Sequence, residues 1–134
     1  MNSRIYVVSI VGIQNSGKST LLMNLLGCDF IVKDGRCTQG ATWKLLRANS
    51  EYLPDFEYFL IVDTEGLESK YNNNDPLYDR KLLLLTLATS HLVIINNNDE
   101  LRRGFQDKLA VCINSLFHIQ APVISAPALL LVFN

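Results

Sequence analysis

Short apolar runs alternate along the chain with segments whose apolar residues recur at helical spacing. The run Ile5–Val11 is continuous and rich in β-branched residues, which is typical of a strand buried on both faces of a sheet. The same pattern predicts further strands at residues 59–62, 92–95 and 129–133, with a weaker candidate at residues 42–46. These runs together predict a sheet whose inner strands are covered on both sides.

Helices are predicted between the strands, at Lys18–Leu26 and at residues 80–89 and 105–117. The first places its leucines on one face and meets Gly27, a residue type that commonly ends helices. Periodicity alone does not decide between helix and strand for residues 80–89. Asp75 as N-cap and Pro76 as the first helical residue favour a helix. Topology agrees, because two parallel strands need a crossover between them.

Strands that alternate with helices predict an α/β fold, a three-layer sandwich with a mostly parallel sheet. The length of 134 residues is close to the usual size of one domain. The chain ends inside the last predicted strand, so we expect residues 1–134 to be one domain, truncated before its C-terminal strand and helix. Ligands of such sheets bind beyond the carboxyl ends of the strands, where we expect the functional residues.

Composition excludes several classes of function. Lys plus Arg number 12 and Asp plus Glu 13, a net charge of -1 that excludes a basic nucleic-acid-binding arm. No apolar run approaches the roughly 20 residues of a membrane-spanning helix. Cys28, Cys37 and Cys112 form no C-x-x-C pair, and the N-terminus has no signal-peptide cleavage site. We therefore expect reduced thiols and a cytoplasmic protein.

The segment GIQNSGKS, from Gly12 to Ser19, matches the phosphate-binding pattern G-x-x-x-x-G-K-[ST] between a predicted strand and a predicted helix. Its glycines let backbone N–H groups converge on phosphates, and the helix N-terminus adds positive potential. Lys18 is expected to reach the β- and γ-phosphates, and the Ser19 hydroxyl to bind Mg²⁺. The residues expected to hold the nucleotide are Gly12, Asn15, Ser16, Gly17, Lys18, Ser19 and Thr20. The pattern predicts a P-loop NTPase.

A second motif, Asp63-Thr-Glu-Gly66, follows the strand predicted at residues 59–62. Asp63 at the end of an apolar strand is expected to hold Mg²⁺, and the Gly66 N–H to contact the γ-phosphate. Thr38 precedes the strand predicted at residues 42–46 and suits a switch role, with its hydroxyl on Mg²⁺ and its N–H on the γ-phosphate. The predicted metal ligands are therefore Ser19, Thr38 and Asp63.

The strings GIQNSGKSTLL, GRCTQG at 35–40 and LIVDTEGL at 60–67 resemble the guanylate-binding-protein and atlastin branch of the dynamin-like large GTPases, and in particular the very large interferon-inducible GTPases. The resemblance implies Mg²⁺-dependent binding and hydrolysis of GTP, with nucleotide-controlled switch loops. It implies the roles already given to Lys18, Ser19, Thr38, Asp63 and Gly66. It also implies GTP and GDP as binding partners and a possible homodimer formed through the nucleotide face.

The sequence departs from that family in its catalytic groups. Guanylate-binding proteins carry a catalytic Arg in the phosphate loop, where this chain has Asn15. Ras-type enzymes place a water-orienting Gln directly after D-x-x-G, where this chain has Leu67. Arg36 is a candidate arginine finger, by analogy with Gα subunits, and an ordinary solvated loop arginine is the alternative.

Recognition of the base has no motif in the sequence. Residues 96–99 read NNND and superficially resemble N-K-x-D, but the preceding strand comes too early, so we interpret them as a strand-end loop. The guanine-reading segment would begin near Asn134, and GTP rather than ATP therefore rests on the resemblance. The alternatives are a GTP-binding scaffold with little hydrolysis, a P-loop ATPase, and a chain that is not stable alone. His91 and His118 are interpreted as structural, and Cys112 as core.

Overall fold

The computed structural model describes residues 3–27, 40–49, 51, 54–68, 75–97, 103–119 and 126–133. Along the chain lie β1 (Ile5–Val11), α1 (Lys18–Leu26), β2 (Ala41–Arg47), β3 (Tyr58–Thr64), α2 (Pro76–Thr89), β4 (Leu92–Asn97), α3 (Arg103–His118) and β5 (Ala128–Phe133). The strands form a five-stranded sheet in the order β2-β3-β1-β4-β5. Only β2 runs antiparallel to its neighbour, so the predicted α/β fold with a mostly parallel sheet is confirmed.

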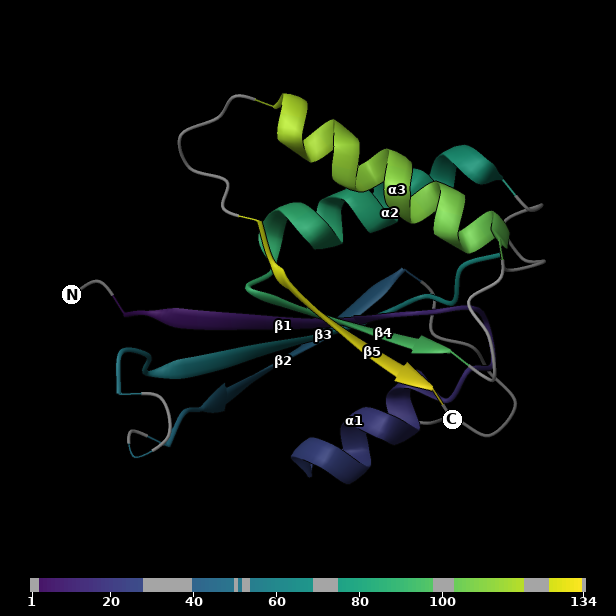
Figure 1. Cartoon of the computed structure of the whole chain (residues 1–134). Helices are drawn as coiled ribbons and strands as arrows, with labels where there is room; N and C mark the ends of the chain where they lie inside the picture. The colour runs from purple at the N-terminus through teal and green to yellow at the C-terminus, as the bar shows by residue number, and fades with distance from the viewer. Residues whose placement is uncertain are drawn as a thin grey trace.

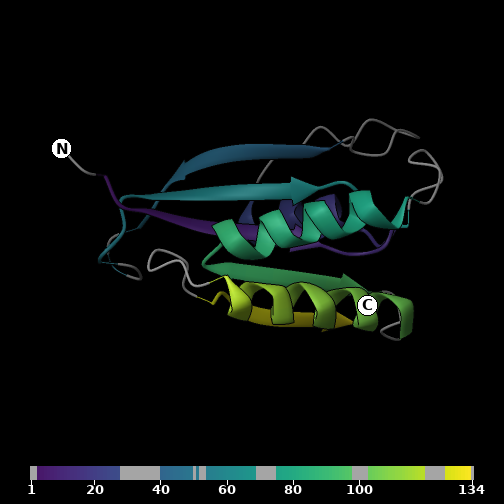
Figure 2. The same ribbon diagram turned by 90° about the horizontal axis from the view of Figure 1, so that it is seen from above.

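The helices cover both faces of the sheet. Helices α2 and α3 lie side by side on one face, and α1 lies on the other (Figures 1 and 2). This arrangement follows from the parallel strands, because each crossover helix must pack back onto the sheet that it leaves. The three layers bring the carboxyl ends of β1, β3 and β4 to one edge of the molecule.

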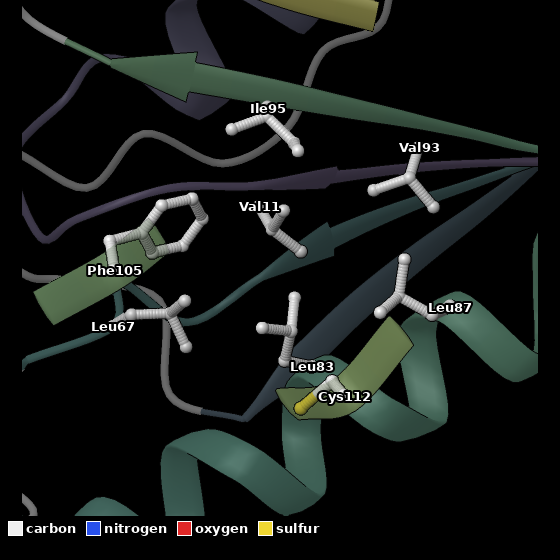
Figure 3. Close-up of a cluster of buried hydrophobic side chains, with 8 residues drawn as sticks. All are labelled: Val11, Leu67, Leu83, Leu87, Val93, Ile95, Phe105 and Cys112. Carbon is white, nitrogen blue, oxygen red and sulfur yellow. The ribbon is translucent and has the colours of Figure 1, made fainter. Parts of the chain in front are cut away.

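Apolar side chains fill the space on each side of the sheet. The cluster under α2 and α3 consists of Val11, Leu67, Leu83, Leu87, Val93, Ile95, Phe105 and Cys112 (Figure 3). The cluster under α1 consists of Val8, Ile10, Leu22, Ile61 and Ile94. Successive residues of β1 and β4 enter opposite clusters because side chains alternate along a strand. The inner strands therefore bury apolar side chains on both faces, as the sequence pattern predicted, with polar residues such as Ser9 and Asn96 buried among them.

Helix α2 begins where the sequence predicted. The Asp75 carboxylate accepts a hydrogen bond from the Leu77 N–H at 2.9 Å, and Pro76 occupies the first turn. This contact satisfies one of the N–H groups that a helix start leaves without a partner. The ambiguous leucine-rich segment is thus helical.

Helix α1 uses less of its predicted apolar face. Leu22 is buried in the α1-side cluster, whereas the side chain of Leu25 is 59% exposed and that of Leu26 is also exposed. Helices α2 and α3 both lie on the opposite face of the sheet from α1 (Figures 1 and 2). The predicted helix is present, but two of the leucines predicted to share one face remain exposed.

Strand β2 forms one edge of the described sheet. The Ala48 N–H donates to the Glu57 carbonyl at 2.8 Å, so the even-numbered residues of β2 direct their backbone groups toward β3. The alternate residues, among them Trp43 and Leu45, direct theirs outward. The side chain of Trp43 is 70% exposed, and that of Leu45 is exposed too. At this edge an open backbone therefore coincides with exposed apolar side chains.

Candidate functional site

The loop after β1 leads directly into α1 and leaves the start of that helix open. Asn15 and Gly17 both adopt left-handed backbone conformations, with φ of 63° and 78°. In the described residues no side chain caps the N-terminus of α1, and its first turn has no acidic residue. The first N–H groups of a helix attract anions when nothing else satisfies them. The loop therefore offers a binding position for phosphate.

The second motif lies directly against this loop. The Gln14 N–H donates to the Leu67 carbonyl at 3.0 Å, and the Leu67 N–H donates to the Gly12 carbonyl at 3.0 Å. A Cβ on Gly66 would lie 2.3 Å from the Cα of Gln14, so only glycine fits there. The two motifs are far apart in the sequence but lie in direct backbone contact, and together they form one side of the candidate site.

Three polar side chains predicted to act at the site, those of Lys18, Ser19 and Asp63, come from these two motifs. The ammonium group of Lys18 is buried and donates to the carbonyl oxygens of Gly12 at 3.3 Å and Ile13 at 3.0 Å. The Ser19 hydroxyl donates a hydrogen bond to the buried carboxylate of Asp63. A hydroxyl and a carboxylate are oxygen ligands of the kind that Mg²⁺ prefers, and Mg²⁺ usually takes few protein ligands beside phosphate and water. The residues present therefore fit this cation.

The other predicted residues fall into two groups. Asn15 and Thr20 are exposed on the loop and on α1, and Ser16 is buried beneath the loop. Thr38 and Arg36 lie outside the described residues, as do Cys28 and Cys37. Within the described ranges, no group of three or more His, Cys, Asp or Glu side chains gathers into a metal site.

Leu67, at the position where Ras-type enzymes have glutamine, points away from the site. Its side chain is 0% exposed and packs with Val11, Leu83 and Phe105 in the cluster under α2 and α3 (Figure 3). A buried aliphatic side chain has no group that orients water. Leu67 therefore cannot take the role of that glutamine.

Asn96 reaches the Gly12–Ser19 loop from β4. Its side-chain Nδ2 donates to the Ser16 carbonyl at 2.5 Å. A Cβ on Gly12 would lie 2.1 Å from the backbone carbonyl oxygen of Asn96. The interpretation of residues 96–99 as a loop is thus wrong for Asn96 and Asn97, which are buried in β4, and residues 98 and 99 lie outside the described residues. Asparagines that continue an apolar strand at its carboxyl end were the signal that could have placed them here.

Glu65 lies inside the second motif and links three segments. Its buried carboxylate Oε2 accepts hydrogen bonds from the Gly40 N–H at 2.7 Å and from the Tyr78 hydroxyl at 3.0 Å. Burial of the phenol, followed by its hydrogen bond to Glu65, raises the pKa of Tyr78. Glu65 therefore connects the residue before β2 to the first turn of α2, a role that sequence reasoning missed.

Glu68 is held by both helices of its face. It adopts φ of 59°, which is uncommon for a residue with a side chain. Its N–H donates to the buried Asp79 carboxylate at 3.0 Å, and Lys108 on α3 lies 2.9 Å from Asp79 and 3.5 Å from Glu68. This Glu68–Asp79–Lys108 cluster fixes the turn that follows Gly66. Since its members come from separate elements, no local sequence signal marks it.

Comparison with known proteins gives matches that cover the chain. The model of the URGCP-like GTPase domain family matches residues 1–134. Interferon-induced very large GTPase 1 of Mus musculus is 37% identical over 131 residues, which are 96% of this chain and 5% of that protein. The Homo sapiens protein of that name is 34% identical over 122 residues, 89% of this chain and 5% of its own length.

A fungal relative matches a shorter stretch. Protein SEY1 of Pyricularia oryzae is 35% identical over 94 residues, which are 68% of this chain and 11% of that protein. The chain thus spans only a small part of the length of the curated relatives it matches. Among the described residues, no helix is both long and apolar enough to cross a membrane.

Proposed function

The chain belongs to the family of URGCP-like GTPase domains, and from this premise we propose that it binds GTP with Mg²⁺ and hydrolyses it. One observation carries the proposal. The Gly12–Ser19 loop and the Asp63–Gly66 motif are joined by backbone hydrogen bonds through Leu67, beside the open N-terminus of α1. Strand, phosphate-binding loop and helix stand in the order in which a nucleoside triphosphate is bound.

Each polar group of the site has a proposed task. Lys18, now bonded to loop carbonyls, turns its ammonium group to the β- and γ-phosphates. Ser19 and Asp63, with Thr38, hold the cation, which neutralises charge on the phosphates when bound. The backbone N–H of Gly66 contacts the γ-phosphate. Thr38 and Gly66 would then report the presence of that phosphate to the loops around them.

Hydrolysis needs a group that stabilises charge in the transition state. Asn15 supplies no cation and Leu67 is buried, so we propose Arg36 as the arginine finger. Arg36→Ala should lower kcat by about 10³-fold or more while leaving GTP affinity almost unchanged. Unchanged turnover would assign Arg36 to the solvated surface instead.

Asn15 in the loop and the buried Leu67 also favour a second candidate, a scaffold that binds GTP and hydrolyses it very slowly. Single-turnover hydrolysis at several protein concentrations separates the two candidates. Phosphate release that accelerates with concentration supports an enzyme that dimerises through its nucleotide face. No release at any concentration leaves the scaffold.

Nucleotide binding is tested directly by titration of the chain with a fluorescent GTP analogue, with and without Mg²⁺, against competing GTP and ATP. We expect saturable binding that Lys18→Ala abolishes and that Asp63→Ala makes insensitive to Mg²⁺. Lys81→Ala, a change at an exposed lysine of α2, is the matched control. Stronger competition by ATP would replace the GTPase with an ATPase, and no binding of either nucleotide would refute both.

A further inference from the structure

We propose that Asn96 is a positioning residue of the nucleotide site: from the end of β4 it fixes the peptide group between Ser16 and Gly17 and thereby aims the Gly17 N–H at bound phosphate. The inference rests on the proposed function. It concerns a residue that the sequence pattern did not mark as functional and that approaches the phosphate-binding loop from behind.

The hydrogen bond determines the direction of a whole peptide plane. The side-chain amide of Asn96 is 0% exposed, and its Nδ2 lies 2.5 Å from the Ser16 carbonyl oxygen. A trans peptide is planar, with its C=O and N–H on opposite sides. Because the Ser16 carbonyl points to β4, the N–H of Gly17 must point to the opposite side of the loop, away from β4.

This peptide has particular need of an anchor. Gly17 adopts φ of 78°, and glycine occupies positive and negative φ about equally easily. A flip of the peptide between Ser16 and Gly17 would thus meet little steric resistance from residue 17. Without Asn96 the carbonyl oxygen could turn toward the phosphates, where it would repel them. The hydrogen bond from Asn96 therefore holds the loop in the conformation that binds anions and disfavours the flipped conformation that would repel them.

The sheet itself places Asn96 at the loop. In the parallel pairing of β1 with β4, Val11 lies opposite Ile95, so the next residues, Gly12 and Asn96, follow in register. A Cβ on Gly12 would lie 2.1 Å from the Asn96 carbonyl oxygen, which shows how closely the two backbones approach. Asn96 is consequently held by strand pairing, a rigid support for a positioning side chain.

Asn97 provides a matched control next to Asn96 in the chain. Its side chain is 1% exposed and points to the opposite face of β4, because side chains alternate along a strand. Within the described part of the chain, neither polar atom of the Asn97 amide has a hydrogen-bond partner. The two asparagines therefore share residue type, strand and burial but differ in contact with the loop.

The first experiment measures Kd for Mg·GTP and Mg·GDP in the full chain and in Asn96→Ala and Asn97→Ala. We expect Asn96→Ala to weaken the binding of both nucleotides about tenfold, the factor that corresponds to one lost hydrogen bond of ordinary strength. Asn97→Ala should change either Kd less than about threefold. Equal effects of the two substitutions would overturn the positioning role.

The second experiment restores the bond with protons. In Asn96→Asp, the neutral acid can donate its O–H to the Ser16 carbonyl, whereas the carboxylate repels that oxygen. Burial favours the neutral acid, so protonation should occur at accessible pH. We expect the affinity of Asn96→Asp for Mg·GDP to rise at least about fivefold from roughly pH 8 to 5.5, relative to Asn97→Asp. Parallel pH profiles of the two variants would contradict the inference.

These results also separate the inference from the proposed function. If the wild-type chain binds nucleotide and Lys18→Ala does not, but Asn96 and Asn97 variants behave alike, the inference alone fails. If the wild-type chain binds no nucleotide, both fail. Urea unfolding of each variant accompanies the binding data, and Asn96→Asp, which keeps the size of the side chain, provides the test if Asn96→Ala does not fold.

Discussion

The ammonium group of Lys108 on α3 lies 2.9 Å from the carboxylate of Asp79 on α2, and only a small part of either side chain is exposed. The Glu68 N–H donates to the same carboxylate oxygen. An ion pair between two helices therefore also holds the turn behind Gly66. Removing Lys108 would leave the carboxylate of Asp79 buried without a cation, and an uncompensated buried charge lowers stability strongly.

We predict that Lys108→Met lowers the free energy of unfolding by about 3 kcal/mol, because Asp79 would remain buried without its cation. Urea denaturation measures the effect. Lys81→Met, on the exposed side of α2, is the control and should change stability by less than about 0.5 kcal/mol. Equal stability of the two variants would show that the ion pair contributes little.

Tyr78 should make stability depend on alkaline pH. Its pKa is raised above the ordinary value of 10.0 by burial and by the bond to Glu65, so the folded state holds the phenolic proton more tightly than the unfolded state. The stabilising contribution is complete below pH 10.0 and is lost as pH rises through the folded pKa. Above pH 10.0, urea midpoints of the wild type should therefore fall more steeply with pH than those of Tyr78→Phe. Parallel slopes would contradict this assignment.

Two glycine substitutions should have opposite effects. In Gly12→Ala the new Cβ would lie 2.1 Å from the backbone oxygen of Asn96, so we expect a loss of about 2–3 kcal/mol and of nucleotide binding. In Gly104→Ala the nearest atom, Glu68 Oε1, is 3.6 Å away, and alanine favours the helix by about 0.5–1 kcal/mol. Thermal unfolding of both variants checks the signs, and tolerance of alanine at residue 12 would refute the close approach.

Cys112 should react slowly while the chain is folded. It is buried among the side chains under α2 and α3, and burial raises the pKa of its thiol, although Arg80 acts in the opposite direction (Figure 3). The thiolate is the reactive form. In a variant with Cys28→Ser and Cys37→Ser, iodoacetamide at pH 8 should modify Cys112 at least about tenfold faster in urea than in buffer. Equal rates would mean that the thiol is accessible in the folded state.

The fold was largely readable from the sequence because its signals are local. Continuous apolar runs predicted the strands, and the Asp75-Pro76 pair decided the ambiguous leucine-rich segment, which is helical. Strand β4 extends to Asn97, past the end predicted at residue 95, because the sheet buries polar residues that hydropathy assigns to solvent. The family that the motifs predicted is confirmed by the match over residues 1–134.

The candidate site was predictable from the sequence only where a motif marked its residues. Ser19 of the first motif and Asp63 of the second lie in hydrogen-bond contact, and the roles of Lys18, Ser19 and Asp63 in binding nucleotide and Mg²⁺ stay predictions. Asn96 and Glu65 act through contacts between segments far apart in the sequence, which depend on strand order and register and so have no pattern of their own. The roles of Thr38 and Arg36 stay predictions.

The apolar edges of the sheet have a consequence for how copies of this chain associate. At one edge stand Trp43 and Leu45, and β5 at the other exposes Leu129, Leu130, Leu131 and Phe133. Association of two copies through these edge strands would be driven by the hydrophobic effect. It would persist at high salt and would not depend on which nucleotide is bound. A dimer through the nucleotide face would instead form when GTP is bound and dissociate when GDP is bound. Oligomers of this chain therefore carry mechanistic meaning only when their size follows the nucleotide.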